Sequence, residues 1–364
     1  DSTDMEEGWW SIRLNSSREY LLENSTTYAE RFWLENVPSS AENSTVWIYN
    51  YSTSSWEKAD LSESWGWSRK FNFTIDVYDQ EGDDVTCLLW IKLNSSGSWV
   101  IAGSDTIAGS PGTPTEGTCS VVWHGFSCGD IGVNDFLWEI RDKEEANYWN
   151  TSVENITIRE SIVTVSIAAG DGVNIDRNYE TKPLTVIVFD VENNSYAPAN
   201  VSFWVEHDNA NLQFDALVKA NSNGNATYWF APDCSYSVGV QNWVAGVTDS
   251  CYVDVNTSKS NVTIWGTFTH YLLTPAGETY LKGSNVTIRG NITDDCGVGI
   301  ADAYVNFSMI SKFTGKVFHC SPINNENNGY YNCTFNTSSM PARWYDIEFN
   351  SSRAYYHDDN RTFD

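Results

Sequence analysis

Apolar residues occupy every second position in many short segments of the chain, and this period of two predicts β-strands rather than helices. The clearest segments form a repeated unit, in which an alternating strand runs into an aspartate turn and a second alternating strand follows. The middle copy contains, in order, Leu184, Val186, Val188, Asp190, Ala199, Val201 and Phe203. A later copy repeats every offset at a period of 104 residues: Ile288, Gly290, Ile292, Asp294, Ala303, Val305 and Phe307. The chain therefore contains a repeated structural unit.

An earlier and looser copy holds Phe73, Ile75, Val77 and Asp79, followed by a shorter acidic turn and a strand at 85–91. Because a unit of about a hundred residues has the size of a domain, three copies predict three domains. Short strands separated by turn residues fit an antiparallel sandwich. We therefore predict an all-β chain of three tandem antiparallel β-sandwich domains at 1–158, 159–258 and 259–364. The short joins at 158–161 and 256–260 favour a semi-rigid rod.

The first domain is longer than its sisters, and its N-terminal part allows two interpretations. Extra strands within one sandwich would account for the additional residues. Alternatively, the strand at 9–15 leaves its own domain and completes the sheet of a neighbouring subunit, as in donor-strand assembly. The segment 27–37 is ambiguous between a strand and a short helix.

The balance of charge limits the kinds of partner. The chain has 48 acidic and 21 basic residues, a formal net charge of -27. Such a surface repels nucleic acid and attracts cations, so we expect no nucleic-acid partner.

Apolar residues make up 41% of the sequence, which is enough for packed cores, and no apolar run is long enough to predict a transmembrane segment. The sequence opens at Asp1 without a leader, so we expect that a signal has been removed or that the numbering begins at the mature end; a longer precursor with a C-terminal anchor stays open.

Twenty Asn-x-Ser/Thr motifs are present, whereas chance would give roughly seven at this composition. Several lie in predicted strands with an apolar middle residue, as in Asn72-Phe73-Thr74. Because side chains alternate between the two faces of a strand, the Asn points to solvent while its neighbour enters the core. We predict dense N-glycosylation, the alternative being an uncoated polar face, at Asn15, Asn24, Asn43, Asn50, Asn72, Asn94, Asn150, Asn155, Asn193, Asn200, Asn225, Asn256, Asn261, Asn285, Asn291, Asn306, Asn332, Asn336, Asn350 and Asn360.

Eight cysteines without metal-type spacing favour disulfides and an oxidising, extracellular compartment. Within the predicted domains the expected pairs are Cys119 with Cys128, Cys234 with Cys251, and Cys320 with Cys333. Cys87 and Cys296 remain, one in each terminal domain, and the middle domain should separate them. They would link neighbouring subunits or be buried free thiols, or Cys87 would pair with Cys119 or Cys128.

The turn of the first copy holds four acidic residues: Asp79, Glu81, Asp83 and Asp84. Oxygen ligands at alternate positions suit calcium, although the Gly and the distant Glu of an EF-hand loop are absent. We predict calcium as the one cofactor besides covalent N-glycans, with a solvated acidic turn as the alternative.

Two sets of motifs carry a resemblance to known surface modules. The strand 199–203 and the segment 223–227, Asn-Gly-Asn-Ala-Thr, resemble the tandem Ig-like repeats of bacterial invasin and intimin type proteins. The turn 293–297, Thr-Asp-Asp-Cys-Gly, and the segment 328–331, Asn-Gly-Tyr-Tyr, are similar to Ig-like repeats in archaeal cell-surface and surface-layer proteins. The likeness covers 160–364 and implies Ig-like sandwiches, and the density of Cys and glycosylation motifs favours an archaeal surface protein. Such modules serve as spacers, lattice or filament subunits and adhesins, so the resemblance specifies the fold better than the function.

No catalytic sequence motif is present, and the five histidines are scattered over the three predicted domains. We therefore predict that the chain is not an enzyme. The leading hypothesis is a structural, self-assembling extracellular glycoprotein, a homopolymer in a surface filament or S-layer lattice. The rival is a cell-surface adhesin or carbohydrate-binding module on a stalk, with exposed tryptophans such as Trp65 and Trp67 as candidates to lie under glycans or at subunit contacts.

Overall fold

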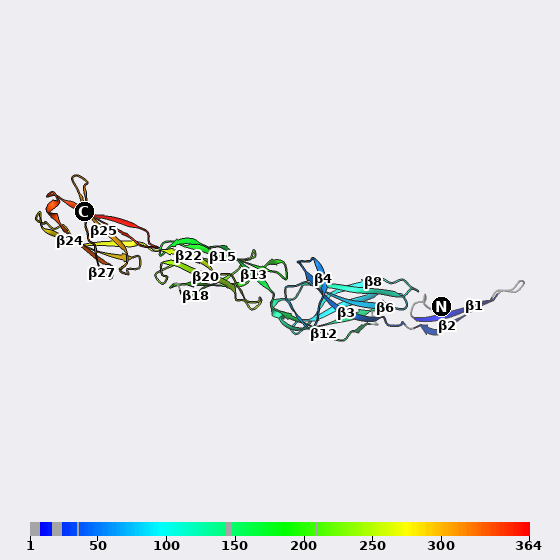
Figure 1. Ribbon diagram of the computed structural model, residues 1–364. Coiled ribbons are helices and arrows are strands. Elements are labelled where there is room, and N and C mark those ends of the chain that lie inside the picture. Colours follow the sequence, from blue (N-terminus) through cyan, green and yellow to red (C-terminus); the bar gives the residue numbers. More distant parts are fainter. Residues whose placement is uncertain (1–7, 17–23, 35, 143–147, 209) are drawn as a thin grey trace. The chain divides into compact units, whose positions relative to one another are not determined.

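The structure, a computed structural model, describes residues 8–16, 24–34, 36–142, 148–208 and 210–364 (Figure 1). Within these ranges the regular elements are β-strands and two short 3-10 turns, Cys128–Asp130 and Thr337–Ser339. The predicted all-β class with antiparallel sheets is confirmed. The chain forms two compact units: Asp1–Val163 with the turns Asp190–Ser195 and Ser250–Val253, and Thr164–Phe189 with Tyr196–Asp249 and Asp254–Asp364.

The first unit contains a sandwich of two sheets. One sheet has the strand order β4, β3, β6, β9, with bounds Ser55–Lys58, Ser40–Asn50, Phe71–Asp79 and Thr115–Trp123. The other has the order β5, β12, β10, β7, β8, with bounds Ser64–Gly66, Glu154–Arg159, Gly132–Arg141, Val85–Lys92 and Trp99–Ile107, and β11 (Tyr148–Asn150) pairs with β10. Every second residue of β6 is buried, and Phe73 and Trp138 fill the space between the sheets. The alternation in the sequence is thus the inner face of this sandwich.

An N-terminal hairpin precedes the first sandwich. Its strands β1 (Gly8–Ser16) and β2 (Asn24–Leu34) pair antiparallel in a two-stranded sheet (Figure 1). Among the described residues neither strand pairs with a third. The ambiguous segment 27–37 is therefore a strand as far as Leu34, and the alternative of strand exchange between subunits stays a prediction.

The middle pair of sheets begins the second unit. One sheet has the order β13, β15, β16, with bounds Val163–Ala169, Lys182–Asp190 and Ser195–Tyr196, and β19 (Asn225–Phe230) pairs with β15. The other has the order β14, β22, β20, β17, β18, with bounds Val173–Asp176, Ser260–Trp265, Gly239–Val247, Asn200–Glu206 and Leu212–Lys219, and β21 (Val255–Asn256) pairs with β20. Strand β22, which we expected to open the third domain, belongs to this middle pair because it extends the ladder on β20.

The last pair of sheets completes the second unit. One sheet has the order β23, β24, β28, β27, with bounds Phe268–Thr274, Asn285–Asp294, Tyr330–Asn336 and Asn324–Asn327. The other has the order β26, β25, β29, β30, with bounds Val317–His319, Tyr304–Ser311, Tyr345–Ser352 and Asp359–Phe363. Phe307 and Phe349 pack between them with ring centroids 4.5 Å apart.

The repeated unit found in the sequence takes the same arrangement in all three pairs of sheets. Its first strand (β6, β15 or β24) and its second strand (β7, β17 or β25) lie in opposite sheets. The aspartate turn is therefore where the chain crosses from one sheet to the other. Three independent domains and a semi-rigid rod stay predictions.

Candidate functional site

The aspartate of each crossing turn is a buried residue that organises the turn. Asp79, Asp190 and Asp294 are 0%, 2% and 6% exposed. In each case one carboxylate oxygen, Oδ1, accepts backbone N–H groups of the residues that follow: Glu81, Gly82 and Asp83; Glu192 and Asn193; Cys296 and Val298. Because a carboxylate can accept several such bonds, it satisfies amides that the turn leaves without strand partners. The conserved offsets of the repeat thus follow from turn geometry.

The first crossing turn carries an additional acidic cluster. Carboxylate oxygens of Asp79, Glu81 and Asp83 lie within 4.8 Å of one another. Burial raises the pKa of Glu81, and the nearby charges of Asp79, Asp83 and Asp142 raise it further, against a hydrogen bond from the Val37 N–H. Asp142, which directly follows β10 and accepts a hydrogen bond from the Asn36 side chain, adds its charge to the surroundings of Glu81 but is not among the carboxylates that lie within 4.8 Å of one another. The four carboxylates repel one another, and a cation would remove that repulsion.

One oxygen of this cluster is left without a hydrogen bond. Asp79 Oδ2 is buried and has no partner, whereas Oδ1 of the same residue accepts three. Across the sheet Thr115, the register partner of Asp79, also has a buried hydroxyl without a partner. Hard oxygen donors of this kind fit Ca²⁺, which takes six to eight oxygen ligands. The residues present therefore suit the predicted metal.

The predicted ligand Asp84 does not belong to this set. Its side chain is exposed and accepts a hydrogen bond of 2.7 Å from the Gly109 N–H. Position 84 immediately precedes the buried strand β7, and successive side chains point in opposite directions. The charge of Asp142 near Glu81 was missed because nearness of distant segments leaves no local spacing in the sequence.

A first junction lies within the first unit, where the sandwich meets the turns Asp190–Ser195 and Ser250–Val253. Glu192, whose side chain is 1% exposed, accepts Arg69 Nε at 2.7 Å and Arg159 Nη2 at 2.9 Å. A disulfide joins Cys128 to Cys251. Trp67 Nε1 donates to the Cys251 carbonyl at 2.7 Å. Covalent, ionic and aromatic contacts thus hold these turns against the first sandwich.

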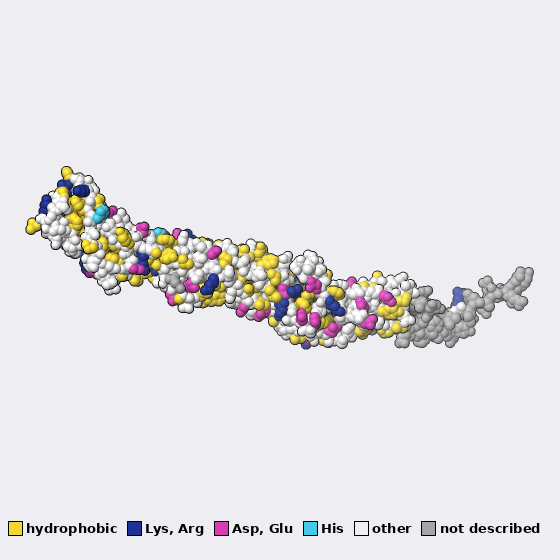
Figure 2. All heavy atoms as spheres, viewed as in Figure 1, with side chains coloured by type: hydrophobic (Ala, Val, Ile, Leu, Met, Phe, Trp, Pro, Cys, Tyr) yellow, Lys and Arg dark blue, Asp and Glu magenta, His cyan; other side chains and the backbone are white. Residues whose placement is uncertain are grey.

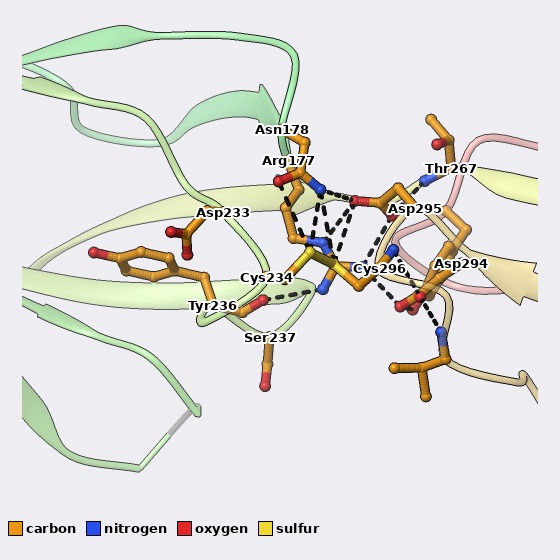
Figure 3. A network of polar contacts seen from close by, with 12 residues as sticks. Arg177, Asn178, Asp233, Cys234, Tyr236, Ser237, Thr267, Asp294, Asp295 and Cys296 are labelled. Carbon is orange, nitrogen blue, oxygen red and sulfur yellow. Dashed lines mark hydrogen bonds and ion pairs between the residues drawn. A yellow bond between two sulfur atoms is a disulfide. The ribbon is translucent and has the colours of Figure 1, made fainter.

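A second junction lies within the second unit, between the end of β14 and the crossing turn after β24 (Figure 3). The Arg177 guanidinium donates to Asp294 Oδ2 at 2.8 Å, to both oxygens of Asp295 at 2.9 Å and to the Tyr236 carbonyl at 3.0 Å. The side chains of the arginine and both aspartates are at most 6% exposed. Burial opposes the charge of Asp295, but hydrogen bonds from Arg177 and the Thr267 N–H outweigh it and lower the pKa of that carboxyl. The junction is therefore a buried cluster in which one guanidinium pairs with two carboxylates.

The same junction holds the second long-range disulfide. Cys234 and Cys296 are joined with Cα atoms 5.6 Å apart, beside Arg177 (Figure 3). The metal candidate formed by Asp294, Asp295 and Cys296 is occupied by these partners: both aspartates bind the guanidinium, and the sulfur is in the disulfide. This cluster is accordingly a joint rather than a metal site.

The four disulfides correct the pairing expected from the sequence. Cys119 bonds Cys87 across the first sandwich, so the pair Cys119–Cys128 is wrong. The pair Cys234–Cys251 is also wrong, because each of these cysteines lies at a different junction. Cys320 does bond Cys333. All eight cysteines are paired within the chain, so a covalent link between subunits through Cys87 and Cys296 is excluded. Nearness in sequence misled the pairing, since Cys128 bonds a cysteine 123 residues away and Cys234 bonds one 62 residues away.

The predicted glycosylation sites with described side chains are exposed or partly exposed residues, although Oδ1 of Asn291 and Oδ1 of Asn350 are buried atoms. Asn15 and Asn24 lie in β1 and β2, where side chains are outside the described residues. None of the other eighteen asparagines is buried. The apolar neighbours expected to face inward are all buried: Phe73, Ile156, Val201, Val262, Val286, Ile292 and Phe307. Asn306, Asn350 and Asn360 align across three adjacent strands, so the last sandwich has a row of neighbouring acceptors.

One cluster has the connectivity of a Ser-His-Asp triad. His270 Nδ1 lies 2.7 Å from Asp359 Oδ2, and His270 Nε2 lies 2.7 Å from Ser351 Oγ. The imidazole is 1% exposed and Ser351 is 4% exposed. The rings of Phe268 and Phe349 pack against His270, and both His270 and Ser351 are buried. A substrate carbonyl could not reach the hydroxyl, so the cluster joins β23, β29 and β30 instead.

Comparison with known proteins gives no family. No protein-family model and no curated protein matches the chain. Among solved structures it is similar to a tetra-tandem repeat in the extending region of a large adhesion protein, at 15% identity and a TM-score of 0.41, covering 98% of this chain and 82% of that one. It is also similar to invasin, a bacterial integrin-binding protein, at 12% identity and a TM-score of 0.39, covering 90% of this chain and 60% of invasin. Extracellular domains 3-5 of Drosophila OTK give 9% identity and a TM-score of 0.27, with 80% and 90% covered. We draw no function from likenesses at these scores.

The search for membrane spans was also negative. In the ranges that the structure describes, no helix has the length and apolar character needed to cross a membrane.

Proposed function

We propose that this chain is a structural, self-assembling extracellular glycoprotein that forms a surface filament or a surface-layer lattice. The observation that carries the proposal is the construction of the two junctions. Each combines a disulfide with ion pairs to buried carboxylates, from Arg69 and Arg159 to Glu192 in one and from Arg177 to Asp294 and Asp295 in the other. The Arg177 joint resists separation of the two sandwiches of the second unit, which suits a subunit that must keep its form under mechanical tension.

The surface supports an extracellular role. Four disulfides persist only in oxidising surroundings. We propose N-glycans on the outward-facing asparagines, which would form a hydrated coat over sheets of a chain with net charge -27. Coat and charge both oppose unspecific association, so copies would join only through particular uncoated surfaces.

We further propose that Asp79, Glu81 and Asp83 hold a calcium ion at the first crossing turn. The unpartnered Asp79 Oδ2 supports this, because a buried carboxylate oxygen without a donor is costly unless a cation faces it. Calcium would supply charge neutralisation and would fix the turn beside Asn36, whose side-chain amide donates to Asp142 at 2.9 Å.

Electron microscopy of the purified, glycosylated protein tests the proposed function. We expect periodic homopolymers that dissociate without breaking disulfides, because all eight cysteines are paired inside the chain. A monodisperse monomer at every concentration that binds a glycan array would instead support the adhesin. Hydrolysis of a glycan or peptide panel would contradict both.

A further inference from the structure

Two of the predicted glycosylation sites lie opposite aromatic side chains on the outer face of a sheet. In the first sandwich, Asn72 of β6 is the register partner of Trp47 on β3. In the last sandwich, Asn291 of β24 lies between two register partners, Tyr271 on β23 and Tyr330 on β28. Opposite residues on antiparallel strands have Cβ atoms about 4.5–5.5 Å apart, so a group attached to either asparagine lies within reach of a ring.

The other strand-borne asparagines of this set have no aromatic register partner among the described residues. Their partners are polar or charged, apart from Ile187 opposite Asn225 and Gly246 opposite Asn256. The aromatic setting therefore distinguishes two sites from the rest of the predicted coat.

The site at Asn72 combines a free amide nitrogen with an aromatic ring that is held in place. Asn72 Oδ1 accepts the Ser120 hydroxyl at 2.9 Å, whereas Nδ2, the atom that carries the sugar in an N-glycan, has no hydrogen bond among the described residues. Trp47 Nε1 donates to Thr74 Oγ1 at 3.2 Å, so the indole leans toward the strand that bears the glycosylation motif. Both neighbours of Trp47 in β3 are buried in the core, which leaves the indole on the outer face.

The site at Asn291 has an aromatic ring on each side. The next residue, Ile292, is buried, so the asparagine lies on the outer face. Asn291 Oδ1 is a buried atom, and the amide therefore presents its nitrogen to the surface. The Arg289 guanidinium carbon lies 4.7 Å from the centroid of the Tyr330 ring, whereas Tyr271 is 51% exposed. Tyr271 is thus the more open of the two rings.

A sugar is a suitable occupant for such a ring. One face of a pyranose carries C–H groups, and the negative face of an aromatic ring attracts them. Figure 2 shows hydrophobic side chains at the surface of both units, among polar and charged ones. Because an N-linked sugar is already tethered one side chain away from the ring, its effective concentration there is high. Its hydroxyl groups can stay in water while the C–H face covers the ring.

We propose that the N-glycans of Asn72 and Asn291 are ordered, with the first sugar of each packed on a neighbouring aromatic ring. The rings are Trp47 in the first sandwich and Tyr271 in the last. The occupant is thus a sugar of the chain's own coat. This inference rests on the proposed glycosylation and adds that two of the glycans are fixed parts of the folded surface. A glycan on a strand position without an aromatic partner, such as Asn155, has no such support.

Hydroxyl-radical footprinting of the full glycosylated chain tests this contact. The wild type is compared with three variants that each remove one acceptor: Asn72→Gln, Asn291→Gln and Asn155→Gln. We expect Asn72→Gln to raise the oxidation rate of Trp47 but not that of Tyr271. Asn291→Gln should do the reverse, because in each case one ring loses its cover. Asn155→Gln should change neither rate, since the register partner of Asn155 is a carboxylate.

Thermal unfolding gives a second measurement at the first sandwich. Asn72→Gln should lower the unfolding midpoint by about 2–4 °C in the wild-type background, the shift that loss of one such contact produces in a domain of this size. In a Trp47→Ala background the same substitution should leave the midpoint unchanged, because the contact is already absent. Equal oxidation of both rings in all four proteins, or the same effect of Asn72→Gln in both backgrounds, would overturn the inference.

Peptide mapping of the native protein separates this inference from the proposed function. Sugars on other asparagines but not on Asn72 and Asn291 would overturn the inference and leave the proposed glycan coat in place. A chain without sugar on any asparagine would overturn both.

Discussion

Replacement of Arg177 by alanine tests the second junction most sharply. The substitution removes a guanidinium that contacts two carboxylates and a backbone carbonyl, and it leaves Asp294 and Asp295 buried without their countercharge. Removing one partner of a buried ion pair costs about 3–5 kcal/mol, because the remaining charge keeps its desolvation penalty. The side chains here are 6% exposed or less, so the full range applies. We expect the free energy of unfolding of the second unit to fall by about 3–5 kcal/mol.

Guanidinium denaturation at pH 7 under oxidising conditions measures this change. Lys182→Ala is the matched control in the same unit, because its pair with Glu180 is 3.4 Å long and both side chains are more than a third exposed. Such a surface pair contributes about 0–1 kcal/mol. If Arg177→Ala unfolded within about 1 kcal/mol of the wild type, the junction would not be the stabilising cluster described here.

Acid provides an independent check on the same cluster. The pKa of Asp295 is lowered in the folded chain, so its contribution is present above the ordinary value of 3.8 and is lost as the pH falls through the folded pKa. The difference in stability between wild type and Arg177→Ala should therefore be constant above about pH 5 and should shrink below pH 4. A difference that stayed constant to pH 2 would contradict the assigned charges.

Three further predictions concern other parts of the chain. Ca²⁺ at about a hundred times its dissociation constant should stabilise the first unit by about 2.7 kcal/mol in calorimetry; Asp79→Asn should abolish the effect, and Asp84→Asn should not. Burial lowers the pKa of His270 despite the neighbouring Asp359, so the contribution of this residue to stability is present above about pH 6.5 and is lost as the pH falls through the folded pKa. His270→Gln should remove this pH dependence from thermal unfolding curves recorded at a series of pH values. Replacing both Cys128 and Cys251 by serine should destabilise the first unit by about 2–4 kcal/mol, and peptide mapping without reductant should recover Cys87–Cys119, Cys234–Cys296 and Cys320–Cys333 unchanged.

The sequence was most informative where structure depends on neighbouring residues. Alternation placed Phe73 and Phe307 on inner faces, and the same alternation placed the asparagines of their motifs outside. The offsets to Asp190 and Asp294 located the crossing turns, because those turns are organised by bonds that span only two to four residues. Local periodicity therefore sufficed for strands, faces and turns.

Contacts between remote segments were not predictable in the same way. The pairings of Cys128 with Cys251 and Cys234 with Cys296 join segments that are far apart in the sequence, and separations of 123 and 62 residues leave no local pattern that predicts them. The charge that Asp142 adds near Glu81 was unpredictable for the same reason. The strand 260–265 was placed in the wrong sheet pair because its alternation fits either neighbour equally well.

The order of the disulfides along the chain has a consequence for proteolysis. The loop closed by Cys128 and Cys251 overlaps the loop closed by Cys234 and Cys296. A single cut at any peptide bond between Cys128 and Cys296 therefore leaves both fragments covalently connected. Only cuts outside this interval and outside the two smaller loops, such as one between Cys296 and Cys320, would release a fragment. A protein exposed to extracellular proteases would thus keep its continuity through most of its central region after a first cleavage.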